Sequence, residues 1–240
     1  MNENLIEIVV ILDKSGSMET LANDTIGIYN SFIREQKEIH ADTILTTVLF
    51  NNTYKLLHDR ISIRDVKPIT NKDYAAKGKK ALLDAVGKTI KDIGFKLYNT
   101  PEADRPRNII FFIITNGEED ISKEYSHEKI KGMAELQKKT YGWEFIFFGA
   151  NIDSASFAAS IGISKNTAFD IAADAEGIFC ALEAMCAAIS NLRKYKSVFA
   201  KEGEDFRKKI KKPKKKKHHA ENNIVSAQEN ESNGGSGTAL

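Results

Sequence analysis

Six short hydrophobic runs along the chain predict the strands of a sheet. They are 5–12, 43–50, 54–63, 108–114, 143–148 and 167–171. Each run is far shorter than a membrane-spanning helix and is rich in β-branched or aromatic residues, which favours strands. The runs 5–12 and 108–114 are apolar at nearly every position, as is typical of parallel strands covered on both faces.

Apolar residues between and after these runs repeat at helical spacing in five segments. These segments are 20–40, 79–93, 125–141, 152–161 and 174–195. Strands that alternate with helices predict a doubly wound α/β domain, with a mostly parallel central sheet and helices on both faces. The turn residues Asn51, Asn52 and Thr53 separate two strand-like runs and predict a hairpin, so one edge strand should be antiparallel.

The alternation of strands and helices stops near residue 200, which predicts two parts: a domain over 1–200 and a disordered tail over 201–240. Nine of the eleven residues in 207–217 are Lys or Arg, a charge density that cannot be buried. They are Arg207, Lys208, Lys209, Lys211, Lys212, Lys214, Lys215, Lys216 and Lys217. Such a run is suited to nucleic acid or to another anionic surface, and a purely solubilising tail is the open alternative.

Composition is that of a soluble globular protein, with 42% hydrophobic and 28% charged residues. Cys180 and Cys186 are six positions apart in a helical segment, where they do not lie above one another, so no disulfide is expected. Because the N-terminus also lacks the pattern of a signal peptide, we expect a reducing, cytoplasmic setting. No apolar stretch approaches about 20 residues, so no membrane span is expected.

The first hydrophobic run ends in a candidate site, Asp13, Ser15 and Ser17. In open α/β sheets, ligands bind outside the carboxyl ends of the strands. Three oxygen-bearing side chains at alternate positions can converge on one hard cation. The other interpretation is a polar turn in which Ser17 is a helix N-cap, and spacing alone does not choose between them.

Three motifs occur in a characteristic order: Asp13-x-Ser15-x-Ser17, the helix opening at 78–86, and Thr115-Asn116-Gly117 after the central strand. Over residues 4–195 the chain resembles the von Willebrand factor A (VWA) family, in particular its small stand-alone bacterial and phage members. The resemblance implies a Rossmann-like VWA fold and a non-enzymatic binding function. It also implies a metal-ion-dependent adhesion site (MIDAS), in which a partner's carboxylate completes the coordination of Mg²⁺ or Mn²⁺.

Carried over by this resemblance, the metal-site residues would be Asp13, Ser15, Ser17 and Asn116. Ser15 and Ser17 would bind the ion through their hydroxyls, and Asp13 would act largely through water. Two positions depart from the family's pattern, because Lys80 stands where the family has Thr and Asn116 stands where it has Asp. The implied site is therefore degenerate.

The Lys80 ammonium has three donors and no lone pair, so it cannot coordinate a cation. Two like unit charges about 4 Å apart repel by about 4 kcal/mol at a dielectric of 20, and a divalent ion doubles this repulsion. We therefore expect weak Mg²⁺ or Mn²⁺ binding or none, with Lys80 as a cation surrogate beside Asp13. Two alternatives stay open. Lys80 can instead extend into solvent or pair with Asp84, and Glu118, Glu119 or Asp120 can supply a replacement carboxylate.

No constellation of residues in the sequence predicts catalysis. His40, His58 and His127 are far apart and are expected at the surface. The expected function is a non-enzymatic protein-interaction module that presents the Asp13 face to a protein partner with little or no dependence on metal. The alternative is an adaptor for nucleic acid or an anionic surface, in which the basic tail supplies the affinity.

Overall fold

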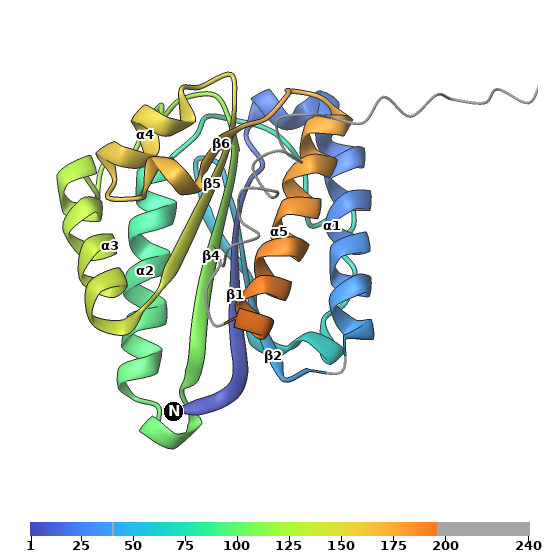
Figure 1. Ribbon diagram of the computed structural model, residues 1–240. Helices are drawn as coiled ribbons and strands as arrows, with labels where there is room; N and C mark the ends of the chain where they lie inside the picture. Colours follow the sequence, from blue (N-terminus) through green and yellow to red (C-terminus); the bar gives the residue numbers. More distant parts are fainter. Residues whose placement is uncertain (40, 196–240) are drawn as a thin grey trace, which may run out of the picture.

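The computed structural model describes residues 1–39 and 41–195, and these form a six-stranded sheet covered by helices (Figure 1). The strands are β1 Asn2–Asp13, β2 Thr43–Phe50, β3 Tyr54–Ser62, β4 Pro106–Asn116, β5 Glu144–Ala150 and β6 Ala168–Asp170. Their order is β3-β2-β1-β4-β5-β6, and every neighbouring pair is parallel except β2 and β3. The predicted doubly wound sheet with one antiparallel edge strand is confirmed.

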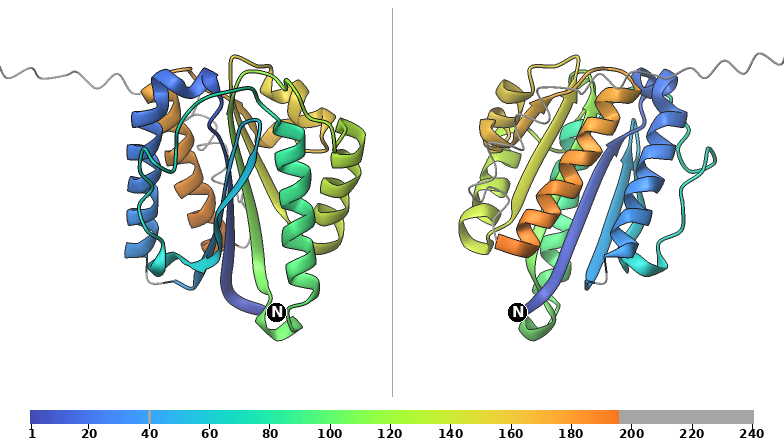
Figure 2. Two further views of the ribbon diagram at one scale, coloured as in Figure 1. Left: turned by 180° about the vertical axis from the view of Figure 1, so that it is seen from behind. Right: turned by 45° about the vertical axis from the view of Figure 1, so that its right-hand side comes forward.

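Five α-helices in the described part of the chain form the outer layers. They are α1 Ala22–Glu38, α2 Leu82–Tyr98, α3 His127–Tyr141, α4 Ser154–Ser160 and α5 Ala175–Tyr195. Helices α1 and α5 cover one face of the sheet, and α2 and α3 cover the other (Figures 1 and 2). Short 3₁₀ turns lie at Gly16–Leu21, Ile63–Asp65, Glu102–Asp104 and Lys165–Thr167.

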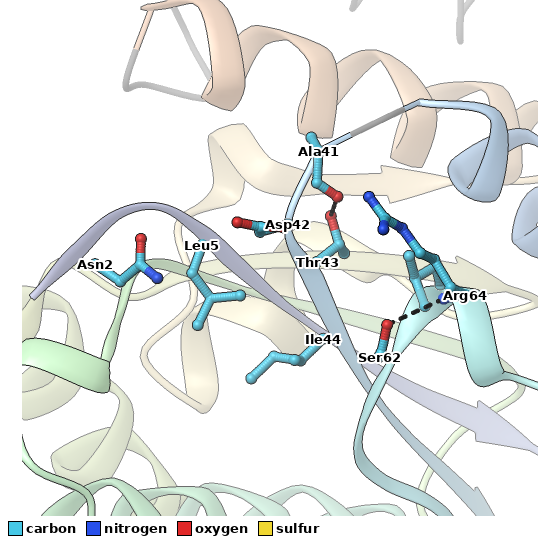
Figure 3. Close-up of a pocket in the computed structure, with 9 residues that line it drawn as sticks. Asn2, Leu5, Ala41, Asp42, Thr43, Ile44, Ser62 and Arg64 are labelled. Carbon is cyan, nitrogen blue, oxygen red and sulfur yellow. Dashed lines mark hydrogen bonds between the residues drawn. The ribbon is translucent and has the colours of Figure 1, made fainter.

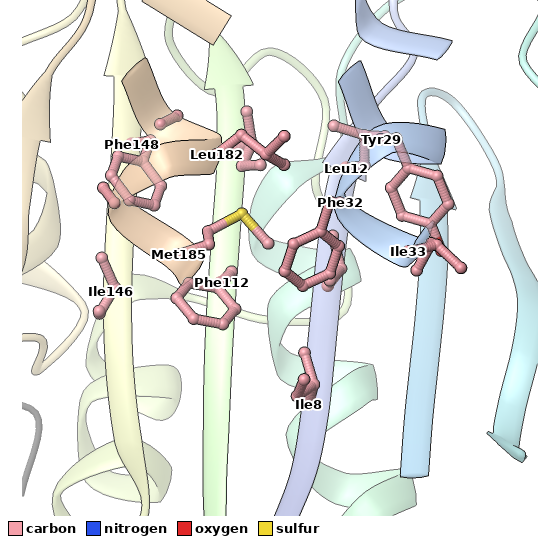
Figure 4. Close-up of a cluster of buried hydrophobic side chains, with 14 of the residues drawn as sticks. Ile8, Leu12, Tyr29, Phe32, Ile33, Phe112, Ile146, Phe148, Leu182 and Met185 are labelled. Atoms are coloured by element: carbon pink, nitrogen blue, oxygen red, sulfur yellow. The ribbon is translucent and has the colours of Figure 1, made fainter. Parts of the chain in front are cut away.

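Strand β1 lies between two hydrophobic cores, one on each face of the sheet. Its residues Ile8, Val10 and Leu12 face α1 and α5, where Phe32 and Met185 pack between the helices and the sheet (Figure 4). The intervening residues Val9 and Ile11 face α2 and α3. Because successive strand side chains point to opposite faces, a strand buried on both sides is apolar at both parities. This explains the nearly continuous hydrophobic run at 5–12.

Helix α5 is the one helix in residues 1–39 and 41–195 that is long and apolar enough to cross a membrane, by length and composition alone. The expectation that no stretch approaches this length is therefore wrong. Half of its apolar window is buried, and Ile178, Met185 and Ile189 pack against the sheet. These contacts are those of a core helix.

The expectation that the histidines lie at the surface is wrong for His58. Its Nδ1 lies 3.1 Å from Thr47 Oγ1 and 3.3 Å from the Tyr29 hydroxyl, and burial lowers the pKa of the ring. The pairing of β2 with β3 shifts register on either side of Thr47, which is the pairing partner of His58. Both cysteines are free, as expected.

A pocket of about 240 Å³ lies beside Asn2 and Asp42, at the amino ends of β1 and β2 (Figure 3). Two of its polar groups are bound locally: Thr43 Oγ1 donates to the Ala41 carbonyl, and the Arg64 N–H donates to Ser62 Oγ. The candidate site is at the opposite end of the sheet, where β1 and β4 finish.

Candidate functional site

The site is built on Asp13, the fully buried last residue of β1. Strands β1 and β4 are parallel neighbours, so their carboxyl ends lie side by side. Asp13 Oδ1 accepts a hydrogen bond from the Ser15 N–H (2.7 Å). Asp13 Oδ2 accepts from Thr115 Oγ1 (2.9 Å) and from the Asn116 N–H (3.2 Å). Three neutral donors therefore hold this carboxylate before any cation is considered.

The Lys80 side chain lies inside the site and is only 4% exposed. Its Nζ lies 3.4 Å from Asp13 Oδ2 and donates to the Asn116 carbonyl oxygen (2.5 Å) and to Ser17 Oγ (3.4 Å). The alternative pairing with Asp84 is wrong. The Asp84 carboxylate instead accepts from the backbone N–H groups of residues 123–125.

Two serines and two asparagines complete the site. Ser17 Oγ donates to the Asn116 carbonyl (2.7 Å) and lies 3.0 Å from Ser15 Oγ. The interpretation of Ser17 as an N-cap is therefore wrong, because its hydroxyl bonds across to β4. The Asn116 amide nitrogen donates to the Ser17 carbonyl, and its amide oxygen accepts from Asn151 (both 2.7 Å). That oxygen is thus already bonded to Asn151.

The loop after β4 holds Lys80 from its backbone side. The Lys80 N–H donates to Asp120 Oδ2, and the Lys80 carbonyl accepts from the N–H groups of Asp120 and Ile121 (3.1 Å each). Glu119 accepts from the N–H of Leu83, in the first turn of α2 (2.9 Å). The alternative of a replacement carboxylate is therefore wrong for Glu119, which bonds to the first turn of α2, and for Asp120, which bonds to the backbone just before it, while Glu118 is exposed. These bonds also explain why α2 begins at Leu82, later than the predicted residue 79.

Four residues of the site were not predicted as site residues, although two of them, Thr115 and Gly117, belong to the motif after the central strand. Thr115 and Asn151 each stand at the carboxyl end of a strand, the same signal that identified Asp13. Tyr74, whose hydroxyl donates to the Asp13 carbonyl, lies in a loop without periodicity, so no sequence signal could have found it. A Cβ atom at Gly117 would lie 3.2 Å from Lys80 Nζ, and the φ of +96° there also favours glycine.

This arrangement does not fit a divalent cation. The Lys80 ammonium lies among the Asp13, Ser17 and Asn116 oxygens, where its charge would repel an ion. The Asn116 amide oxygen, which would have to replace the usual carboxylate, is bonded to Asn151. In the part of the chain that the structure describes, no group of three or more His, Cys, Asp or Glu side chains could hold a metal.

Known proteins resemble this chain in structure and not in sequence. No protein-family model and no curated protein sequence matches it. Solved structures do. A D319A mutant of the PilB minor pilin from Streptococcus sanguinis is 13% identical with a TM-score of 0.57, and the match covers 81% of this chain and 63% of that one. A von Willebrand factor type A structure from Catenulispora acidiphila is 12% identical with a TM-score of 0.53, covering 78% and 42%. The chain has the VWA fold.

A third structure, proximal thread matrix protein 1 from the mussel byssus, bears on the metal. It has a zinc-occupied MIDAS motif, is 13% identical with a TM-score of 0.52, and is covered over 47% of its length by 76% of this chain. The chain thus spans less than half the length of that protein. At this identity the likeness shows the VWA fold alone, and the MIDAS chemistry of this chain rests on its own residues.

The basic segment 207–217 lies outside the described residues. Its expected affinity for nucleic acid or an anionic surface therefore stays a prediction.

Proposed function

We propose that this chain is a non-enzymatic protein-interaction module that binds its partner on the carboxyl-end face of the sheet, around Ser17, without a divalent ion. The observation that carries the proposal is the position of the Lys80 ammonium, between the Asp13 carboxylate and the Asn116 carbonyl. A covalently attached cation in this position balances the Asp13 charge at all times. Binding should then be independent of free metal.

The same contacts change what a partner can reach. An ammonium has three N–H donors, and three oxygen atoms lie against Lys80 Nζ, from Asp13, Ser17 and Asn116. No donor is left over for an incoming carboxylate, whereas a bound metal would offer an open coordination position. A partner should therefore contact the exposed Ser17 and its surroundings, and Lys80 should act as an internal support.

The absence of catalysis is also part of this proposal. The Ser15 and Ser17 hydroxyls contact each other, and the Ser17 hydroxyl donates to the Asn116 carbonyl. Among the described residues, neither hydroxyl is hydrogen-bonded to a His or carboxylate base. A nucleophile needs a base within hydrogen-bond reach. The basic side chain that does contact Ser17, Lys80, is held as an ammonium against the Asp13 carboxylate and the Asn116 carbonyl. We therefore assign the two hydroxyls a role in holding the site together and in contacting the partner.

A steric block of the face tests the proposal. Gly16 is exposed, and a Cβ atom there would make only an ordinary contact, 3.4 Å from the Gly78 carbonyl oxygen. Gly16→Tyr should therefore cover the face without disturbing the fold. Gly132→Tyr on α3 is the matched control, because a Cβ atom there would meet nothing within 4 Å.

The tagged full chain and both variants are used to capture partners from cells of the source organism, with EDTA or with added Mg²⁺. We expect one set of partners that is retained in EDTA, lost with Gly16→Tyr and kept with Gly132→Tyr. Loss of the partners in EDTA, or their retention by Gly16→Tyr, would contradict the proposal.

A further inference from the structure

Three lysines lie on the carboxyl-end face beside the Lys80 site, and we name Lys14, Lys55 and Lys77 the basic rim. Backbone hydrogen bonds hold their segments together. The Lys14 N–H donates to the Phe50 carbonyl (2.8 Å), and the Lys77 N–H donates to the Lys14 carbonyl (2.9 Å). The side-chain amide of Asn51 also donates to the Lys77 carbonyl (2.9 Å). The rim is thus attached to a fixed backbone at the ends of β1 and β2.

The charges of the basic rim are poorly compensated. Partial burial, followed by the positive charges of Lys55 and Lys77, lowers the pKa of Lys14. Among the ion pairs of the described residues, the rim takes part in one, between Lys55 Nζ and Asp73 at 3.7 Å. Like charges held together raise the free energy of the unbound protein, and a bound anion relieves this repulsion.

The other half of the same face is acidic. Exposed carboxylates lie at or after the carboxyl ends of strands β4, β5 and β6, at Glu118, Asp153, Asp170 and Asp174. Two of them are held in place as helix caps, since Asp153 accepts from the Ser156 N–H and Asp174 from the Gly177 N–H. This half would repel a long polyanion laid across the face. A short anionic segment confined to the basic rim avoids that repulsion.

We propose that the basic rim binds a short acidic segment of a partner protein, whose carboxylates pair with Lys14, Lys55 and Lys77 next to Ser17. The inference rests on the proposed function and specifies the chemistry of the partner. It follows from the different positions of the lysines. The Lys80 ammonium is buried and bonded inside the site, whereas the rim lysines are partly or fully exposed and can reach a partner. Binding should weaken strongly with salt, because exposed charge pairs are screened.

Amide chemical shifts of the ¹⁵N-labelled full chain test this inference at the resolution of single residues. The probe is a hexaglutamate peptide with blocked ends, added in excess over the domain and over the basic segment 207–217. We expect the amides of Lys14, Ser17 and Lys77 to shift in a saturable manner. This readout separates the rim from the tail within one molecule.

Two charge-matched triple variants serve as test and control. Lys14→Gln, Lys55→Gln and Lys77→Gln together should weaken the binding seen at Ser17 at least tenfold. Lys91→Gln, Lys131→Gln and Lys139→Gln remove the same charge from exposed positions of α2 and α3, and should weaken it less than twofold.

Three results would overturn the inference: peptide shifts confined to the tail, equal losses in the two triple variants, or rim shifts caused by duplex DNA at lower concentration than by the peptide. Partner capture separates its failure from that of the proposed function. A partner lost with Gly16→Tyr but kept by the rim variant contradicts the acidic segment alone. A partner kept by both contradicts the proposed function as well.

Discussion

Strand β1 carries two fully buried carboxylates on the same face, Glu7 and Asp13, and among the described residues each forms one ion pair. Both Glu7 oxygens accept from Arg60 Nε (3.1 and 3.2 Å), which among the described residues is the one hydrogen-bond donor to this side chain. Asp13 is bound by three neutral donors in addition to Lys80. The Glu7 charge therefore depends on a single side chain and contributes to the structure of the sheet. The Asp13 charge is already stabilised by neutral donors, as in a preorganised binding site.

The pKa of Glu7 shows that its one ion pair does not fully compensate for its burial. Burial raises the pKa of Glu7 above its ordinary value, although the nearby Arg60 acts to lower it. Removing water from this carboxyl thus costs more than its single ion pair returns. If the comparison is right, loss of the cation should cost far more at Glu7 than at Asp13.

The largest effect is expected for Arg60→Met, which leaves Glu7 buried and unpaired. The free energy of unfolding in urea should fall by about 3–5 kcal/mol. The control is the double variant with Glu7→Met, in which no charge is left and much of the loss should be recovered. A loss below about 1 kcal/mol in Arg60→Met would show that Glu7 does not depend on this cation.

A smaller effect is expected for Lys80→Met, which keeps the apolar stem and removes the ammonium. Asp13 retains the Ser15, Thr115 and Asn116 donors, so unfolding should become easier by about 1–3 kcal/mol. The same urea titration measures it. A cost equal to or above that of Arg60→Met would contradict the view that the backbone holds the Asp13 charge.

The penalty of Arg60→Met should also depend on pH. Without Arg60, the pKa of Glu7 rises further, so the folded protein takes up a proton at a pH where the unfolded chain does not. More protons bound in the folded state mean that stability rises as pH falls toward 4.5. We expect the penalty to shrink by about 1–2 kcal/mol from pH 7.5 to 5.5. The double variant, which lacks Glu7, should show no such change.

The smallest effect is expected for Thr115→Val, which removes one of the neutral donors to Asp13 and keeps the β-branched shape. Because Asp13 retains two N–H donors and Lys80, the stability should fall by only about 1 kcal/mol. Thermal unfolding of the full chain can measure this difference. A loss above 3 kcal/mol would mean that the donors do not share the charge as described.

The fold could be predicted because hydrophobic pattern and turn chemistry agree along most of the chain. The run at 5–12 is apolar at both parities because β1 is buried on both faces, and Asn51 marks the hairpin that reverses β3. Helix boundaries were harder to predict where they depend on side-chain hydrogen bonds between segments that are distant in the sequence. The late start of α2 depends on Glu119 and Asp120, which no local pattern connects with Lys80.

The composition of the site could be predicted more fully than its geometry. Residue types and the end of the first strand identified Asp13, Ser15 and Ser17. The resemblance to the VWA family added Asn116 and Lys80, and the charge of Lys80 argued against a metal. The direction of the long Lys80 side chain could not be inferred, since pairing with Asp84 one turn later satisfied the same local rules. The structure excludes this pairing because the Asp84 carboxylate accepts hydrogen bonds from the backbone N–H groups of residues 123–125.

If the Lys80 ammonium takes the place of a divalent ion, the site should not bind free metal, and isothermal titration with Mg²⁺ and Mn²⁺ measures this. The wild-type chain should give no binding heat at millimolar metal. The variant Lys80→Thr with Asn116→Asp removes the ammonium and adds a carboxylate, and it should bind both ions. Micromolar binding by the wild-type chain that Asp13→Ala abolishes would contradict the account.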